Sequence, residues 1–405
     1  MVLSNLLKTI VKSKSIETKQ SATRSMMAYH QPGSPIWSGR DYVALTKNGF
    51  SRNVIAYRCI RMIAEAASSA PLRIMAGGSV MHEHPIITLL EAPNSAQSGA
   101  EFFESVYGYL QASGNSYLEA GIIDGQVREL YTLRPDRVKV RANRTGWVEA
   151  YEYSVGGKKT VFPVPQNGGP FDKTISPILH VKLFHPLDDH YGMSPLEAAG
   201  ANVDMHNAAL SWNKALLDNA ARPSGALVYS GPEGAENLTA DQFDRLKSEL
   251  DSSFGGARNA GKPLLLDGGL DWRSMSLSPA DMDFIEAKHS AAREIALAFG
   301  VPPMLLGIPG DNTYSNYREA NLAFWKQTVL PLVKKVAASL SMWLRPGIES
   351  NQDFSIICDI SDIDALSTER DALWRRISSA TFLTDDEKRE QLGLPLSQNS
   401  IGENV

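Results

Sequence analysis

The chain has 405 residues, of which 43% are apolar and 21% are charged, as is typical of a globular protein. Its 31 glycines and 22 prolines are too few for a fibrous or low-complexity protein. No apolar run approaches the roughly 20 residues needed to cross a bilayer. Cys59 and Cys358 are too few for a disulfide framework or a thiolate metal site, so we expect a reducing compartment. The first residues place Lys8 inside an apolar stretch and do not predict a secretory signal.

Charge divides the chain into a basic head and an acidic body. The net charge is −5, yet residues 1–50 carry seven Lys and Arg against Glu17 and Asp41. A protein that reads nucleic-acid sequence concentrates Lys and Arg on one face, which this distribution does not favour. Residues 1–34 begin with a short amphipathic pattern and continue as a polar linker. We expect a solvated tail or one that docks on a neighbouring subunit, in preference to a membrane-surface helix.

The first half of the chain predicts a mixed α+β domain with one core. An Ala-rich helix is expected over residues 53–70, and a second over 98–111. Between residues 115 and 185, short β-prone runs separated by Gly, Pro, Asp or Asn predict an antiparallel β region. The other expected elements are a strand over residues 72–75 and a helix that opens at His84-Pro85.

The second half predicts long helices around a small insertion. A helix over residues 195–221 has Ser194 as its N-cap, and its narrow apolar seam suits packing beside copies of itself. The insertion, residues 222–278, predicts a compact β-α-β lobe, and a helix follows it to Gly300. After a Pro-rich loop comes a long helix over residues 317–344, which Pro331 should kink. The strands expected in the insertion are residues 226–229, 263–266 and 271–277, and its helix runs from Thr239 to Phe254.

Two patterns that resemble catalytic or ligand sites have weak support. Residues 256–262 have the G-x-x-x-x-G-K spacing of a phosphate loop, but Pro263 supplies no hydroxyl for Mg²⁺, and a helix precedes where a strand is needed. The cluster His180, His185, His190, Asp188 and Asp189 fits no ligand spacing on a helix. We therefore expect no enzyme activity, cofactor or metal, and keep a metal-dependent nuclease dependent on His185 or Asp188 as an alternative.

A polar-aromatic patch precedes the last long helix. Aromatic side chains beside an arginine can hold single-stranded nucleic acid, although patches of this kind usually serve capping and packing. The patch consists of Asn312, Tyr314, Asn316, Tyr317 and Arg318.

Several segments together resemble the HK97-type portal proteins of tailed phages and gene transfer agents. The resemblance covers about residues 35–345, and the order of the segments over that length is its specific feature, whereas residues 1–34 and 350–405 match poorly. The segments are YGMSPL (191–196), RPSG (222–225), LT (238–239), GKP (261–263), LSPAD (277–281), IALAFGVPP (295–303), LG (306–307), TYSN (313–316), NVIAYRCI (53–60), HP (84–85) and APN (92–94).

The resemblance implies a portal-protein fold of the α+β class and a ring, commonly of twelve subunits, at one capsid vertex. DNA would pass through its central channel. The implied parts are an N-terminal arm (1–34), a wing (35–190), a stem helix (191–221), a clip (222–278), a second stem helix (279–300), a tunnel loop (301–316), a long kinked helix with wing return (317–365) and a helical crown (366–405).

The resemblance also implies roles for individual residues. We expect a subunit interface along the stem at Leu196, Val203, Leu210 and Leu217. The tunnel loop would place Ile308, Asp311, Asn312, Thr313, Tyr314, Asn316 and Arg318 at the channel. The clip would present Arg245, Arg258, Asn259 and Lys262 as a docking surface. Implied partners are further copies of the chain, double-stranded DNA without sequence preference, the terminase large subunit, a head–tail adaptor and the major capsid protein, with no membrane. The implied location is the virion or virus-like particle, and the bacterial host cytoplasm during assembly. An oligomeric adaptor or scaffold stays open as the alternative.

Overall fold

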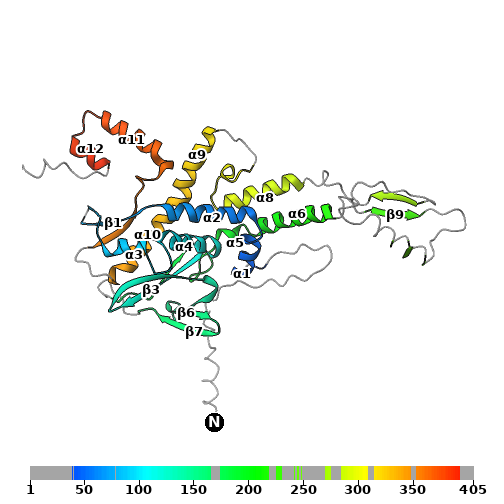
Figure 1. Cartoon of the computed structure of the whole chain (residues 1–405), viewed down its shortest axis with the longest axis horizontal. Coiled ribbons are helices and arrows are strands. Elements are labelled where there is room, and N and C mark those ends of the chain that lie inside the picture. Colours follow the sequence, from blue (N-terminus) through cyan, green and yellow to red (C-terminus); the bar gives the residue numbers. More distant parts are fainter. Residues whose placement is uncertain are drawn as a thin grey trace, which may run out of the picture. The chain divides into compact units, whose positions relative to one another are not determined.

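The structure is a computed structural model in which the chain forms two compact units (Figure 1). Unit 1 comprises residues 1–198 and 296–405, and unit 2 comprises residues 199–295. The residues that the structure describes are 39, 41–77, 79–165, 174–218, 225–229, 241, 244–245, 248, 270–274, 284–308, 314–347 and 353–392.

Unit 1 combines groups of helices with antiparallel sheets, which bears out the expected α+β class. The α-helices described in the chain are α1 (Tyr42–Leu45), α2 (Val54–Ser69), α3 (Pro85–Glu91), α4 (Gly99–Ser113), α5 (Pro195–Ala198), α6 (Gly200–Asp218), α8 (Phe284–Ala298), α9 (Tyr314–Phe324), α10 (Leu330–Leu344), α11 (Ser367–Ser379) and α12 (Asp385–Gln391). The strands are β1 (Leu72–Ala76), β2 (Ser79–Met81), β3 (Asn115–Ile123), β4 (Gln126–Leu133), β5 (Val138–Ala142), β6 (Val148–Val155), β7 (Lys158–Pro163), β8 (Ile178–Lys182), β9 (Gly225–Tyr229), β10 (Leu270–Ser274) and β11 (Phe354–Cys358).

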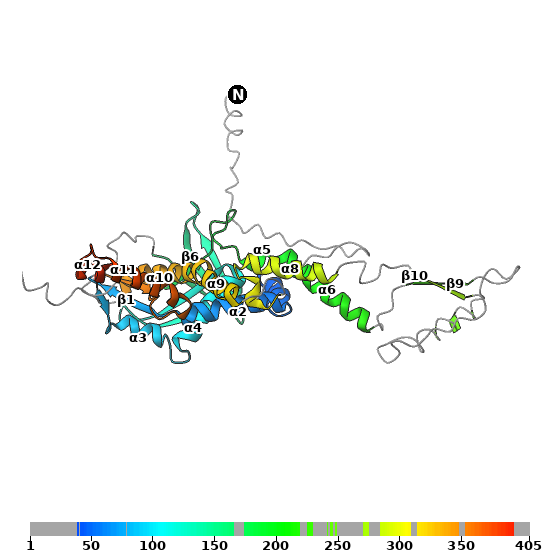
Figure 2. The same cartoon turned by 90° about the horizontal axis from the view of Figure 1, so that it is seen from above.

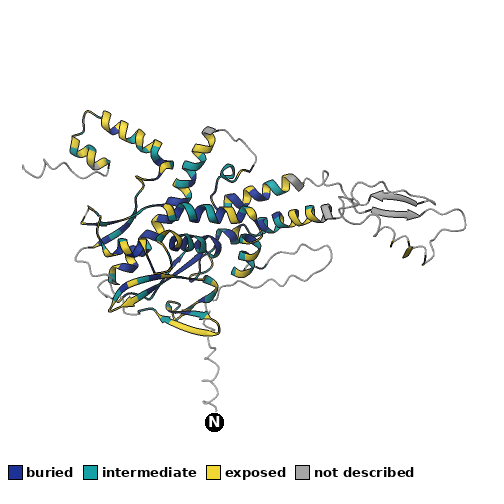
Figure 3. Ribbon diagram, viewed as in Figure 1, coloured by how far each residue is buried: buried dark blue, intermediate teal, exposed yellow. Residues whose placement is uncertain are grey.

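Side-chain caps explain where the first helices begin. Asn53 Oδ1 accepts hydrogen bonds from the backbone N–H groups of Ile55 and Ala56, and so starts α2 one residue after the expected position. Ser98 and Glu101 form a reciprocal capping box at the start of α4. The two helices α2 and α4 pack together, and both contain buried residues, which are dark blue on the ribbon of Figure 3.

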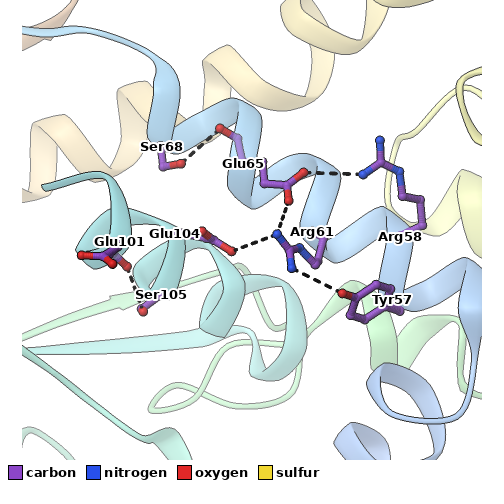
Figure 4. Close-up of polar contacts among 8 residues, drawn as sticks. All are labelled: Tyr57, Arg58, Arg61, Glu65, Ser68, Glu101, Glu104 and Ser105. Atoms are coloured by element: carbon purple, nitrogen blue, oxygen red, sulfur yellow. Dashed lines mark hydrogen bonds and ion pairs between the residues drawn. The ribbon is translucent and has the colours of Figure 1, made fainter. Parts of the chain in front are cut away.

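A polar network on the surface links α2 to α4 (Figure 4). Arg61 donates to Glu65 on its own helix and to the Tyr57 hydroxyl at 3.3 Å, and its guanidinium lies 3.8 Å from Glu104 of α4. Arg58 adds a contact of 3.5 Å with Glu65. The hydrogen bond to Glu65 raises the pKa of Arg61. Because all these groups are well exposed, we assign the network a small contribution to stability.

The β region expected between residues 115 and 185 forms two antiparallel sheets in unit 1. Their strand orders are β4-β3-β8 and β5-β6-β7. Tyr117, Leu133, Val138, Tyr151 and Ile178 pack into one hydrophobic cluster from both sheets.

A third sheet joins residues far apart in the sequence. β1 pairs with β11 in antiparallel register, Leu72 opposite Cys358 and Ala76 opposite Phe354, and β2 pairs with the other edge of β1. The sequence analysis expected the chain to return to the wing over residues 317–365, but it did not predict the strand β11. Ser341 of α10 secures the return, since its hydroxyl accepts from the backbone N–H of Ile356 at 2.7 Å.

Two glycines and one asparagine bring β3 against the segment before α5. Gly114 has φ 73°, and a Cβ on Gly192 would lie 2.2 Å from the Gly114 carbonyl oxygen. Asn115 Oδ1 accepts from the Gly192 N–H at 2.7 Å and from His180 Nε2 at 2.9 Å. The backbones can approach this closely only because neither glycine carries a side chain.

The expected single helix over residues 195–221 is interrupted at Ala199, between α5 and α6. Ser194 is its N-cap as expected, since its hydroxyl accepts from the Glu197 N–H at 2.9 Å. Unit 2 contains α6, most of α8 and the antiparallel pair β9-β10, visible in Figure 2. Leu270 pairs with Tyr229 in that strand pair, close to two of the expected strands. The expected strand at residues 263–266 lies outside the described residues.

The long helix after the loop is divided by a π-helical turn, η5 (Trp325–Val329), between α9 and α10. Pro331 lies in the first turn of α10, where its missing N–H costs little. We expected a kink at Pro331, and the structure has a π-helical turn just before this residue. None of the helices in the described part of the chain is long and apolar enough to cross a membrane.

Candidate functional site

The loop that follows α8 is anchored at its first residues within unit 1. Gly300 ends the helix in the left-handed conformation, with φ 66°, and the Val301 N–H donates to the Ala296 carbonyl oxygen at 2.9 Å. Thr328, in the π-helical turn η5, donates its hydroxyl hydrogen to the Gly300 carbonyl oxygen at 2.6 Å. The first residue of the loop is therefore hydrogen-bonded to the long helix that follows the loop.

A 3₁₀ turn, η4 (Pro303–Leu306), fixes the next stretch of the loop. Gly307 closes the turn with φ 71°. The Ile308 N–H donates to the Pro303 carbonyl oxygen at 3.3 Å, and the Ile308 side chain is only 6% exposed. Ile308, one of the expected channel residues, therefore packs inside its own chain.

The remaining expected channel residues fall on or beside α9. Asp311, Asn312 and Thr313 lie outside the described residues. Tyr314 is the first residue of α9, and the side chains of Asn316 and Arg318 are exposed. Residues 301–308 contain no charged side chain. The described loop therefore presents backbone, proline and apolar surface, and the first basic group after it is Arg318.

The four expected stem residues differ in exposure. Leu196 is fully buried and Val203 is 3% exposed. Leu196 packs on Gly49, where an added Cβ would come within 2.4 Å of its Cδ1 atom. Leu210 is 36% exposed, and Leu217 lies on α6 with its side chain outside the described set. Within the described part of the seam, Leu210 is thus the residue available for contact with another molecule.

Two further exposed apolar residues on α6 escaped the sequence analysis. Met205 is 46% and Trp212 is 44% exposed. They lie outside the apolar seam of roughly 3.5-residue period. Large apolar side chains on the otherwise polar side of the helix are the signal that could have revealed them. His206 is buried on the same helix, and burial together with the nearby Lys288 lowers its pKa.

The expected clip residues are described only in part. Arg245 lies in a helical stretch and is exposed. Arg258, Asn259 and Lys262 lie outside the described residues, as does the phosphate-loop-like segment 256–262.

The histidine cluster before α5 has structural partners. His180 lies on β8, stacks on Tyr117 at 4.3 Å between ring centroids and donates to Asn115 Oδ1. Burial lowers its pKa to about 3, so it stays neutral. The His185 Nδ1 atom accepts from the Leu187 N–H at 3.0 Å. Asp188 Oδ1 accepts the backbone N–H groups of both His190 and Tyr191, at 2.8 and 3.0 Å.

These bonds make the segment an ordered turn. In the part of the chain that the structure describes, no three His, Cys, Asp or Glu side chains are grouped so that they could hold a metal ion. The metal-dependent nuclease alternative therefore has no geometric support among the described residues.

Comparison with known proteins identifies a family over most of the chain. The family described as phage portal protein matches residues 55–393. An uncharacterised protein of Rickettsia bellii is 43% identical over 350 residues, covering 86% of this chain and 88% of the relative.

Solved structures agree with the family match. A chain from the neck of an empty gene transfer agent (GTA) particle with C6 symmetry is 49% identical, with a TM-score of 0.70, and the match covers 90% of this chain and 96% of that one. A chain from the neck of a native GTA particle with C12 symmetry is 48% identical, with a TM-score of 0.68 and the same coverage.

Proposed function

The chain belongs to the phage portal protein family and has a capsid portal role; on this premise we propose that twelve copies form a ring through which double-stranded DNA enters and leaves a particle. The observation that carries the proposal is the similarity to the neck chains of GTA particles, at 48% identity with C12 symmetry. Because the match covers 96% of that chain, it spans nearly a whole ring subunit. The proposed location is the neck of such a particle, with assembly in the bacterial host cytoplasm.

Each part of the chain has a proposed place in the ring. Residues 35–190 with the return over 317–365 form the wing, and residues 191–221 and 279–300 form the stem. Residues 222–278 form the clip, 301–316 the tunnel loop and 366–405 the crown. In support, unit 2, residues 199–295, contains α6, most of α8 and, between them in sequence, the paired strands β9 and β10.

The proposed channel surrounds DNA without gripping it. Every phosphate that Lys or Arg neutralises adds a salt-dependent binding term, and such binding would retard sliding. Residues 301–317 contain no basic side chain, and twelve chains at −5 carry about −60 in total. The ring therefore repels the DNA backbone, with screening beyond about 10 Å at 0.1 M salt. The loop then acts through steric contact.

We expect the double variant Asp311→Lys and Asn312→Lys to slow DNA packaging while ring assembly is unchanged. Two lysines in each of twelve loops would add 24 positive charges at the constriction and remove 12 carboxylates. Packaged DNA per particle, measured over time at two salt concentrations, reports the effect. The isosteric variant Asp311→Asn is the control for loss of the carboxylate alone. Equal packaging rates for the lysine variant and the parent at low salt would contradict a channel that binds the DNA backbone only weakly.

The proposed partners outside the ring are the terminase large subunit and a head–tail adaptor at the clip, and the major capsid protein around the wing. The exposed Arg245 supports a polar docking surface on the clip. The portal itself is proposed to be a structural part without bond-breaking activity, and the motor lies in a separate protein.

Electron microscopy of the purified chain tests the ring directly. We expect top views with twelvefold symmetry and an axial opening. An alternative oligomeric adaptor or scaffold would instead give dimers or trimers without a central hole. A stable monomer, or an assembly closed along its axis, would contradict the proposed function.

A further inference from the structure

Positive charge gathers on the sheet β5-β6-β7 of unit 1. Residues 138–163, which contain this sheet, carry five Lys and Arg against Glu149 and Glu152, although the whole chain is at −5. They belong to none of the tunnel loop, the stem and the clip, so the proposed channel leaves them without a role. Charges more than about 10 Å apart are screened at 0.1 M salt, so the local excess of positive charge decides what binds here.

Strand alternation places three of these cations on the outer face of the sheet. Val138 belongs to the hydrophobic cluster shared with the sheet β4-β3-β8, and Phe162 packs against it. Because successive side chains of a strand point to opposite faces, Lys139, Arg141 and Lys159 lie on the face away from the cluster. The ribbon of β7 is largely yellow, for exposed residues, in Figure 3. The basic surface, as we name it, consists of the exposed residues Lys139, Arg141, Arg144, Lys158 and Lys159.

The single acid on the outer face is engaged by two of the cations. Glu152 Oε1 lies 2.8 Å from Lys159 Nζ, and Glu152 Oε2 accepts from Arg141 Nε at 2.9 Å. The Glu152 side chain is only 7% exposed, whereas those of Arg141 and Lys159 are 50% and 64% exposed. The hydrogen bonds from Lys159 and Arg141 lower the pKa of Glu152 to about 2, so the carboxylate stays ionised. It therefore orients both cations and leaves their remaining N–H groups available to a ligand.

The other three cations of the basic surface have no acidic partner. Lys139 on β5, Arg144 in the turn between β5 and β6, and Lys158 at the start of β7 make no ion pair with any residue that the structure describes. All three are exposed. The basic surface thus presents uncompensated positive charge on two strands and at both ends of the sheet.

The turn between β5 and β6 has a fixed shape. Asn143 Oδ1 accepts from the backbone N–H groups of Thr145 and Trp147, at 2.9 and 3.0 Å. Trp147 is 74% exposed and lies three residues after Arg144. The indole ring is therefore a natural probe for any molecule that covers this end of the basic surface.

We propose that the basic surface binds the phosphate backbone of double-stranded DNA without sequence preference, as a contact separate from the channel. Ammonium and guanidinium groups that neutralise phosphates release counterions, and this gain does not depend on the bases. Guanidinium groups also match phosphate geometry through paired N–H donors. Double-stranded DNA is the polyanion that the proposed function brings to the subunit, so the inference rests on that function. An acidic protein segment is the competing occupant, and the test distinguishes the two.

Binding of a covalently closed circular duplex to the purified full-length protein tests the proposal, because a closed circle cannot thread through a preformed ring. Filter binding at several salt concentrations measures the affinity and its salt dependence. The test variant combines Lys139→Gln, Arg144→Gln and Lys158→Gln. We expect it to bind about tenfold or more weakly at roughly 50 mM salt. The slope of log K against log salt should become less steep by about 2.7, or about 0.9 for each lost phosphate contact.

A second triple variant separates the basic surface from net charge. Lys47→Gln, Arg128→Gln and Lys334→Gln remove the same three charges from exposed positions of unit 1 outside this sheet. This control should bind DNA as the parent does. Glu152→Gln should instead strengthen binding, because both cations that the carboxylate neutralises are then free for phosphate. Circular dichroism verifies folding, and if Glu152→Gln fails to fold, the two triple variants decide.

Trp147 locates the bound DNA. The fluorescence that is lost in Trp147→Phe belongs to this indole, and its quenching by acrylamide should fall when the parent binds the circle. Unchanged quenching would place the DNA elsewhere and overturn the proposal.

The remaining outcomes decide between occupants. Equal loss of DNA binding in both triple variants would show general charge attraction and overturn the proposal. Binding of poly-L-glutamate that the first triple variant loses, without binding of the circle, would assign the surface to an acidic protein segment and overturn the DNA assignment. Rings that do not bind the circle would overturn this inference and leave the portal function intact. A monomer that binds the circle through the basic surface would support the inference and contradict the ring.

Discussion

Glutamate in place of Leu210 should leave the subunit folded and soluble but unable to form rings. Leu210 lies on α6 and is 36% exposed in the single chain, so the substitution disturbs little within the subunit. Met205 and Trp212 on the same helix are also large, apolar and exposed. In a ring, a charge introduced at this surface would be desolvated without a partner, at a cost of several kcal/mol per ion. Because a closed ring repeats every contact, the cost recurs at each interface.

Size-exclusion chromatography with light scattering measures the result, and circular dichroism verifies folding. We expect monomers for Leu210→Glu and rings for the control Leu210→Met, which keeps an apolar side chain of similar volume. Rings of normal size from the glutamate variant would place the subunit interface elsewhere on the chain. A variant that loses its helical spectrum would show that Leu210 supports the subunit itself.

Alanine in place of Gly192 should strongly destabilise unit 1. The new Cβ would lie 2.2 Å from the Gly114 carbonyl oxygen and 2.7 Å from the backbone nitrogen and oxygen of Leu183. All of these are backbone atoms that cannot rotate away. The two hydrogen bonds between Asn115 and the Gly192 backbone would be stretched by the same displacement. Overpacking of this kind costs about 3 kcal/mol, and we expect the midpoint of thermal unfolding to fall.

Gly108→Ala is the matched control, because it adds the same methyl group where no atom lies within 4 Å. Gly108 is inside α4, where alanine is favoured over glycine by about 0.5–1 kcal/mol. The control should therefore raise the unfolding midpoint slightly. If both variants unfold at the parent temperature, the close approach between β3 and the segment before α5 is not a source of stability.

Local features of the molecule could be predicted from the sequence because they depend on residues that are neighbours along the chain. Ser194 caps a helix within three residues of itself, so its position predicts where α5 begins. The β region between residues 115 and 185 follows from short β-prone runs and the turn residues between them. The family was also readable, because the order of its segments is a property of the sequence alone.

Contacts between distant residues were decided only by the tertiary structure. The pairing of β1 with β11 joins positions nearly 290 residues apart, and no local pattern in either strand names its partner. Ile308 lies in a loop whose sequence suggested exposure, yet its contacts bury it. A cavity lined by Asp41, Asp188 and Glu197 likewise unites segments that are separate in the sequence. Sequence by itself thus determined many of the elements and the portal family. Burial, strand partners and the cavity required the folded chain, because each depends on which surfaces meet.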